Sequence, residues 1–211
     1  MGFISLLFKE PFLFLALFIA LSFSVILHEV AHGWTAYKFG DDTAKNAGRL
    51  SLNPKVHFDF LGTFFLLFVG FGWAKPVPVD YSCLWPNKFA FIAVSLAGCF
   101  VNLIIAFVGA FFLVRLNFLM NDFFEMFFTM LIQVNVLLAT FNLIPIPPLD
   151  GSRVVLALAP KNVKKILIKL ERYGIIIIFV LLYFNFLDPV INGIYKIIFN
   201  MILTFLKITG G

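Results

Sequence analysis

Long apolar runs separated by short polar stretches make up most of this chain. Three of the runs, Pro11–Tyr37, Asn87–Val114 and Phe123–Ile144, are each long enough to cross a bilayer as a helix, because about 20 apolar residues suffice. Two further apolar runs, Gly174–Leu187 and Val190–Leu206, follow with an Asp-Pro pair between them. The pattern predicts an all-α, multi-pass membrane protein with about five or six transmembrane or re-entrant helices.

Two segments between the first and second long runs do not fit a simple membrane span. Residues Phe58–Trp73 are apolar, but the run is short and is interrupted by Gly62, Gly70 and Gly72. This run is either re-entrant or spanning. Residues Lys75–Asp80 alternate proline with valine, which is typical of an edge strand because proline cannot donate to a sheet ladder. We therefore expect a small extended, β-like segment there.

The composition agrees with lipid as the main solvent of the chain. Of the 211 residues, 62% are hydrophobic and 13% are charged, against about 45–50% and about 25% in soluble domains. The first apolar run has no basic leader and no small-residue cleavage site, so we expect no cleavable signal peptide. We find no internal repeat and no appended soluble domain, which predicts a single membrane-embedded domain over residues 1–211.

The basic residues lie between the apolar runs. The net charge of +5 could suggest nucleic-acid binding, but these residues form no stripe on a soluble domain. We therefore expect membrane lipid as a partner and no nucleic acid. With the N-terminus outside, nearly all lysines and arginines become cytoplasmic, and only Lys9 and Arg115 lie outside. The positive-inside rule favours this layout, which requires Phe58–Trp73 to enter and leave the membrane on one side.

The candidate chemistry begins with His28-Glu29-Val-Ala-His32, near the end of the first apolar run. Histidines four residues apart share a helix face, so both imidazoles can reach one zinc ion at about 2.0–2.1 Å. Glu29 then lies beside the metal, where it can take a proton from the attacking water and pass it to the leaving amine. The alternative is a simple His–Glu pair, but ionisable groups at membrane depth are costly and indicate function.

A catalytic zinc ion usually has three protein ligands and one open position. His57 is a poor third ligand, because it lies in a polar stretch next to Asp59. Asp150 is the better candidate, since the topology puts it on the same membrane side as the histidines, and Gly151 lets the backbone turn closely. The alternative is that Asp150 caps a helix beginning near Ser152. We expect one zinc ion per chain, toward the cytoplasmic side of the cell (inner) membrane.

Two asparagines, Asn102 and Asn142, stand within apolar runs. A buried amide in lipid needs a hydrogen-bonding partner. Both residues can serve as packing contacts between helices, or they can hold the substrate backbone and stabilise the oxyanion of the tetrahedral intermediate. The residues themselves leave these two roles open.

Three motifs together resemble the site-2 protease family of intramembrane zinc metalloproteases. They are His28-Glu29-x-x-His32, Gly98-x-x-x-Asn102 and Asn142-x-x-Pro145-x-x-x-Leu149-Asp150-Gly151. The stretches Gly48–Pro54 and Trp73–Pro78 are also similar to bacterial and archaeal members. The resemblance is to the compact type, without a PDZ-like or cystathionine-synthase-like domain. Cys99 is a departure, because many relatives have proline after the motif glycine.

The resemblance implies that His28, His32 and Asp150 bind zinc and that Glu29 activates water. It places Asn102 and Asn142 near the substrate. It implies hydrolysis of peptide bonds within or next to transmembrane segments of other membrane proteins. A helical substrate must then unwind locally, and residues Lys75–Asp80 could pair with the unwound strand.

Two other functions use the same residues. A zinc or cation transporter would need further ionisable groups along a path through the membrane, whereas the acids and histidines here collect at one depth. An inactive relative would bind membrane proteins without cutting them, against which the intact Glu29 argues. We expect a transmembrane protein as substrate, and the sequence leaves the oligomeric state open.

Overall fold

The computed structural model describes residues 3–70, 72–85, 87–116 and 121–209. These residues form helices and no strand, which confirms the predicted all-α class. The helices in chain order are α1 (Ile4–Lys9), α2 (Pro11–Lys38), α3 (Thr43–Asn46), the 3-10 turn η1 (Pro54–Val56), α4 (Phe60–Val69), α5 (Tyr81–Leu84), α6 (Lys88–Arg115), α7 (Asp122–Asn142), α8 (Asp150–Leu158), α9 (Lys161–Glu171), α10 (Gly174–Tyr183) and α11 (Asp188–Ile208).

Four of the described helices, α2, α6, α7 and α11, are long and apolar enough to cross a membrane. The predicted spans over Pro11–Tyr37, Asn87–Val114 and Phe123–Ile144 agree with α2, α6 and α7 to within two residues at each end. The last two apolar runs divide differently from the prediction. Two helices, α10 and α11, are present as predicted, but the break lies at residues 184–187 and the Asp-Pro pair begins α11. Proline fits the first turn of a helix, where its missing N–H has no partner to lose.

The short helices α4 and α10 are apolar but have only 10 residues each. At about 1.5 Å per residue such a helix covers roughly half of a hydrocarbon core about 30 Å thick. For α4, this length favours the re-entrant alternative. The helix begins at an Asp59 cap, whose carboxylate accepts the Gly62 N–H at 2.8 Å. It ends at Gly70 with φ +88°, a conformation that glycine adopts without strain.

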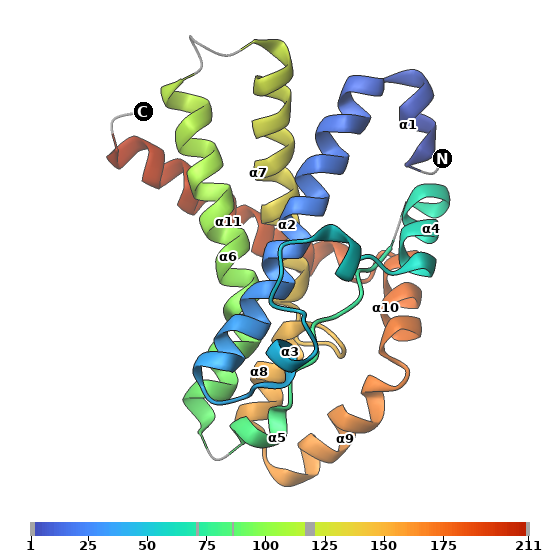
Figure 1. Cartoon of the computed structure of the whole chain (residues 1–211), viewed down its shortest axis with the longest axis vertical. Helices are drawn as coiled ribbons and strands as arrows, with labels where there is room; N and C mark the ends of the chain where they lie inside the picture. Colours follow the sequence, from blue (N-terminus) through green and yellow to red (C-terminus); the bar gives the residue numbers. More distant parts are fainter. Residues whose placement is uncertain (1–2, 71, 86, 117–120, 210–211) are drawn as a thin grey trace.

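Helices α2, α6 and α7 pack along one another and form the centre of the molecule, and α11 crosses α6 and α7 (Figure 1). The core shared by α6, α7 and α11 combines alanines of α6 with mainly branched side chains of α7 and α11. It contains Ala106, Ala110, Ile132, Val136, Ala139, Ile198 and Ile202. Small residues let membrane helices approach closely and gain van der Waals contacts. These contacts stabilise the packing, because the hydrophobic effect does not drive helices together within lipid.

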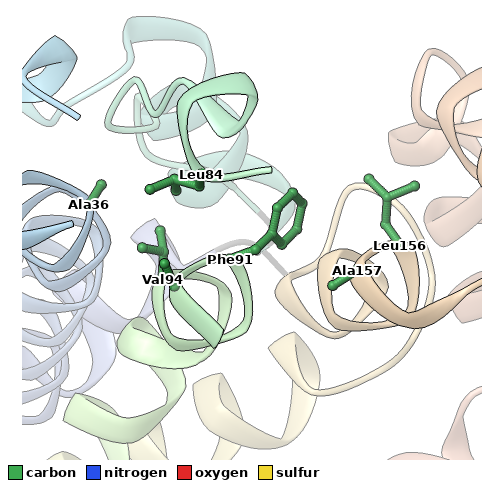
Figure 2. Close-up of a cluster of buried hydrophobic side chains, with 7 residues drawn as sticks. Ala36, Leu84, Phe91, Val94, Leu156 and Ala157 are labelled. Carbon is green, nitrogen blue, oxygen red and sulfur yellow. The ribbon is translucent and has the colours of Figure 1, made fainter. Parts of the chain in front are cut away.

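A second core cluster fixes α8 against the ends of α2 and α6. Figure 2 shows Phe91 of α6 between Leu84 of α5 and the α8 side chains Leu156 and Ala157. Phe91 is fully buried, with 1% of its surface exposed. Because Asp150 is the first residue of α8, this packing determines where its carboxylate lies relative to the other helices.

The segment Lys75–Asp80 is neither helical nor paired with a strand. Its backbone is instead held by other loops. The hydrogen bonds run from Lys75 N–H to the His57 carbonyl (2.8 Å), from Arg49 Nη2 to the Lys75 carbonyl (2.7 Å), and from Asp80 N–H to Asp41 Oδ2 (2.7 Å). A Cβ on Gly33 of α2 would lie 2.7 Å from Val77 Cγ1. Glycine at that position therefore lets the segment lie directly against α2.

Candidate active site

Three potential metal ligands converge between α2 and the start of α8. His28 Nε2 and His32 Nε2 lie 3.1 Å apart, and each lies 3.2 Å from Asp150 Oδ2. Donors about 2.0–2.1 Å from a tetrahedral zinc ion lie roughly 3.3 Å from one another. The separations therefore fit a single ion held by these three residues. In the described part of the chain, this is the group of His, Cys, Asp and Glu side chains close enough to hold a metal.

The second nitrogen of each imidazole is already committed. His32 Nδ1 donates to the Val94 carbonyl at 2.7 Å, and His28 Nδ1 donates to Asn102 Oδ1 at 2.8 Å. Such partners fix the tautomer of a ligating histidine and direct the lone pair of Nε2 toward the metal. Two lone pairs and a carboxylate then face one another at about 3 Å, an arrangement that a cation among them would stabilise.

Asp150 is placed by α8 and does not cap it. The cap position is Leu149, which makes no side-chain cap, and Asp150 is the first helical residue. A Cβ on Gly151 would lie 2.3 Å from the Leu143 carbonyl oxygen, so glycine permits the tight turn before the helix. Protonated imidazoles at His32 and His28 would lower the pKa of Asp150 well below its ordinary value, whereas burial raises it. With both imidazoles neutral, a bound metal ion would take over the part of keeping the Asp150 carboxylate ionised.

Gly98 makes room for both imidazoles. A Cβ there would lie 2.4 Å from His32 Nε2 and 2.5 Å from His28 Cε1, so even alanine would displace the rings. This gives the Gly98-x-x-x-Asn102 motif a physical meaning: the glycine admits the two rings, and the asparagine one turn later orients His28. The sequence marked the spacing but did not assign Gly98 to the site, because the clash arises only from the packing of α6 on α2.

Glu29 is anchored by a backbone group that the sequence did not single out. The Val77 N–H donates to Glu29 Oε2 at 2.8 Å. The two flanking residues, Pro76 and Pro78, have no N–H of their own. A carboxylate accepts through both oxygens, so this bond orients Glu29 and leaves its other oxygen for proton transfer.

The two asparagines lie in different surroundings. Asn102 is fully buried, and its Nδ2 has no hydrogen-bonding partner in the described structure. Asn142 is half-buried and donates to the Leu138 carbonyl of its own helix at 3.0 Å. His57 lies outside the three-ligand group and bonds to the Ser51 carbonyl at 2.6 Å. Of the sequence candidates, the structure thus joins Asn102, but not Asn142 or His57, to the ligand group.

Replacing Asn102 with leucine removes the acceptor that orients His28. We expect metal affinity to fall by about 10–100-fold, as for other partners of metal-ligating histidines. Competition between the purified protein and a zinc chelator measures the change. Asn135→Leu is the matched control, because Asn135 is equally buried but bonds to Ser24. Equal affinities of the two variants would contradict an orienting role for Asn102.

The membrane-spanning helices and the three-ligand site with an adjacent glutamate define a class, the intramembrane metalloproteases. The chain belongs to peptidase family M50, the site-2 protease family. The model of this family matches residues 117–185, which include Asn142 and Asp150.

Two relatives extend the similarity to the rest of the chain. The chain is 44% identical over 172 residues to a Bacillus subtilis protein named "Putative zinc metalloprotease YwhC", with 78% of each chain covered. It is 28% identical over 200 residues to "Putative zinc metalloprotease Rip2" of Mycolicibacterium smegmatis, which covers 89% of this chain and 71% of that protein. No solved structure matches the chain.

Proposed function

We propose that this chain is a zinc endopeptidase that hydrolyses peptide bonds within or next to transmembrane segments of other membrane proteins. The observation that carries the proposal is the convergence of His28 Nε2, His32 Nε2 and Asp150 Oδ2. Glu29 follows the first of these ligands on a helix long and apolar enough to span a membrane. The two relatives, whose names describe zinc metalloproteases, support zinc as the metal.

The residues of the chain divide the catalytic work. His28, His32 and Asp150 hold the ion, which when bound polarises the scissile carbonyl and lowers the pKa of water. Glu29 accepts the proton of the attacking water and delivers it to the leaving amine. The Val77 N–H keeps the Glu29 carboxylate in place during both transfers. Preorganisation of this kind avoids the cost of reorienting the base in each cycle.

Asn102 fits a second role besides orienting His28. Its Oδ1 accepts from His28, and its Nδ2 is buried without a partner in the described structure. A buried amide without a hydrogen bond costs about 1–3 kcal/mol. Both asparagines stay candidates for the oxyanion donor, but a substrate carbonyl oxygen would reach the fully buried Asn102 only after the surrounding side chains move.

The segment Lys75–Asp80 can assist an unwound substrate only in a restricted way. The N–H groups of Lys75, Val77 and Asp80 are already donated within the chain, and the two prolines have none. A substrate strand lying along the segment would therefore mainly donate its own N–H groups to the carbonyls of the segment. This requires a substrate that has unwound, because a helical segment keeps its N–H groups bonded internally.

The proposed site faces the cytoplasmic side of the cell membrane. Helices α3, α5, α8 and α9 lie together at one end of the molecule, beside the end of α2 that follows the two histidines (Figure 1). Basic side chains are concentrated in α9 and just beyond it, namely Lys161, Lys164, Lys165, Lys169 and Arg172. The positive-inside rule supports a cytoplasmic location for this end. Residues 1–211 form one membrane-embedded domain in this proposal.

Metal removal tests the proposal. The purified protein in detergent is incubated with single-span reporter proteins that carry a tag at each end. We expect internal cleavage that stops after treatment with a zinc chelator and returns when Zn²⁺, but not Mg²⁺, is restored. Bound metal is measured in parallel by mass spectrometry. Cleavage that continues in protein shown to be free of metal would contradict the proposal.

A further inference from the structure

A cavity of about 130 Å³ lies between α2, α4 and the residues that follow α4. Its walls are mainly apolar side chains of α2 and α4, together with Trp73 and Ala74 and with Leu138 of α7. Of the polar side chains in the lining, His57 bonds through Nε2 to the Ser51 carbonyl and the Thr63 hydroxyl donates to the Asp59 carbonyl. His57 Nδ1 is buried without a partner in the described structure. Apolar side chains make up most of the remaining lining.

The cavity lies on the face of α2 that carries Glu29. Phe18, Ser22 and Val25 line it, and Glu29 continues this row at a spacing of three or four residues. Residues at this spacing share one face of a helix. The cavity therefore lies along α2 on the N-terminal side of Glu29, and on this face its lining begins about one helical turn away, at Val25.

The opposite wall is also continuous with Glu29. Trp73 and Ala74 line the cavity, and Val77, three residues after Ala74, donates its N–H to the carboxylate. This wall packs tightly on α4, since a Cβ on Gly62 would lie 2.0 Å from the Trp73 carbonyl oxygen and 3.0 Å from Trp73 Cδ1. Glycine at position 62 brings α4 and Trp73 into direct contact, so the cavity is built into the fold beside the site.

The size of the cavity decides what it can hold. An engineered cavity of about 150 Å³ lined by apolar side chains binds one benzene molecule, whereas a helix with its side chains is about 10–12 Å across. This cavity therefore accommodates a single large side chain and not a whole helix. Since lipid already solvates apolar groups, its selectivity must come from packing and from exclusion of wrong shapes.

We propose that this cavity is a side-chain subsite that selects a leucine- or phenylalanine-sized residue next to the scissile bond of the substrate. The inference rests on the proposed function, because it assigns a substrate preference to the same site. Val25 on α2 and Leu66 on α4 both line the cavity, so a change in the size of either side chain changes the space that it offers. A transmembrane segment is rich in such side chains, so the subsite chooses among many candidate bonds after local unwinding.

The test changes the size of the cavity by mutation and measures which residue next to the scissile bond the protease prefers. The probe is a single-span reporter that the wild-type protein cuts, with each residue flanking the mapped cut replaced in turn by Gly, Ala, Leu, Phe and Trp. We expect one flanking position to favour Leu or Phe over Ala by about 10-fold in competition, the lower end of the range for hydrophobic pockets. Val25→Phe fills the cavity and should bring this ratio near one. Leu66→Ala enlarges it and should raise the relative rate of the Trp reporter about 10-fold.

Matched controls carry the same changes on lipid-facing positions. Val108→Phe on α6 and Leu61→Ala on α4 alter side chains that are 48% and 58% exposed, so both should keep the wild-type ratios. Equal ratios in Val25→Phe and Val108→Phe would overturn the subsite. So would a change in overall rate with unchanged ratios, the result expected if a lipid chain occupies the cavity.

A binding measurement separates this inference from the proposed activity. Single-span reporters with a photoreactive phenylalanine at successive positions along the span are crosslinked to the Glu29→Gln variant, and the attachment sites are mapped by mass spectrometry. We expect attachment to Leu21, Val25 or Leu66 in the cavity. Attachment only to lipid-facing residues would overturn the subsite. Absence of cleavage by the wild-type protein, with attachment in the cavity, would instead count against the proposed function alone.

Discussion

Replacing Glu29 with glutamine should lower the cleavage rate of a membrane reporter by about 10²–10⁴-fold, the usual contribution of a general acid–base group. Glutamine has nearly the same shape and keeps an oxygen that can accept the Val77 N–H. The fold and the anchoring bond are thus preserved, and the ability to carry a proton is lost. Because glutamine leaves His28, His32 and Asp150 untouched, bound zinc should stay at the wild-type level.

The measurement combines cleavage rates with metal content in the same preparations. Glu125→Gln is the control, since Glu125 lies in the first turn of α7, outside the group of metal-ligating side chains. It should leave both quantities unchanged. Undiminished cleavage by Glu29→Gln would refute the role of Glu29 as proton carrier. Loss of zinc together with cleavage would instead point to a part in holding the metal.

Most of the helical frame could be predicted because lipid imposes a simple rule on the sequence. A membrane helix must be about 20 residues long and apolar throughout, and α2, α6 and α7 follow that rule closely. Ionisable groups are costly in such a helix, so the few that occur there indicate function. His28, Glu29 and His32 stood out for this reason, and Asp150 followed from membrane side and neighbouring glycine.

What the sequence could not predict depends on contacts between distant segments. Gly98 is identified only by the imidazoles that its missing Cβ admits. Val77 contributes its backbone N–H. Every residue except proline has this group, so the residue type does not reveal the contact. The alternation in Lys75–Asp80 predicted a β-like segment, yet its N–H groups bond to Glu29, Asp41 and the His57 carbonyl instead of a ladder. A pattern of prolines limits which bonds a segment can make, but it does not name the partners.

Asp150→Ala should reduce bound zinc from about one ion per chain to a small fraction of that. Three protein ligands are the usual minimum for a catalytic zinc ion, and this change leaves two imidazoles 3.1 Å apart without the carboxylate that joins them. Cleavage should fall below detection, because the ion supplies the Lewis acidity of the reaction. Metal analysis after dialysis against a weak chelator measures the loss, and the cleavage assay on the same sample gives its consequence.

The control for Asp150→Ala uses a second aspartate that begins a helix. Asp188 is the first residue of α11, as Asp150 is of α8. If Asp150 acted only through the charge at a helix start, both alanine variants would lose about 0.3–1 kcal/mol of stability, and both would keep their zinc. If Asp150 is a metal ligand, Asp150→Ala should bind much less zinc than Asp188→Ala. The unfolding temperatures of the two variants, measured without metal, should be similar. Full zinc occupancy in Asp150→Ala would therefore show that Asp150 is not a metal ligand. Loss of a helix-start charge lowers stability and leaves the metal content unchanged, whereas loss of a ligand lowers the metal content.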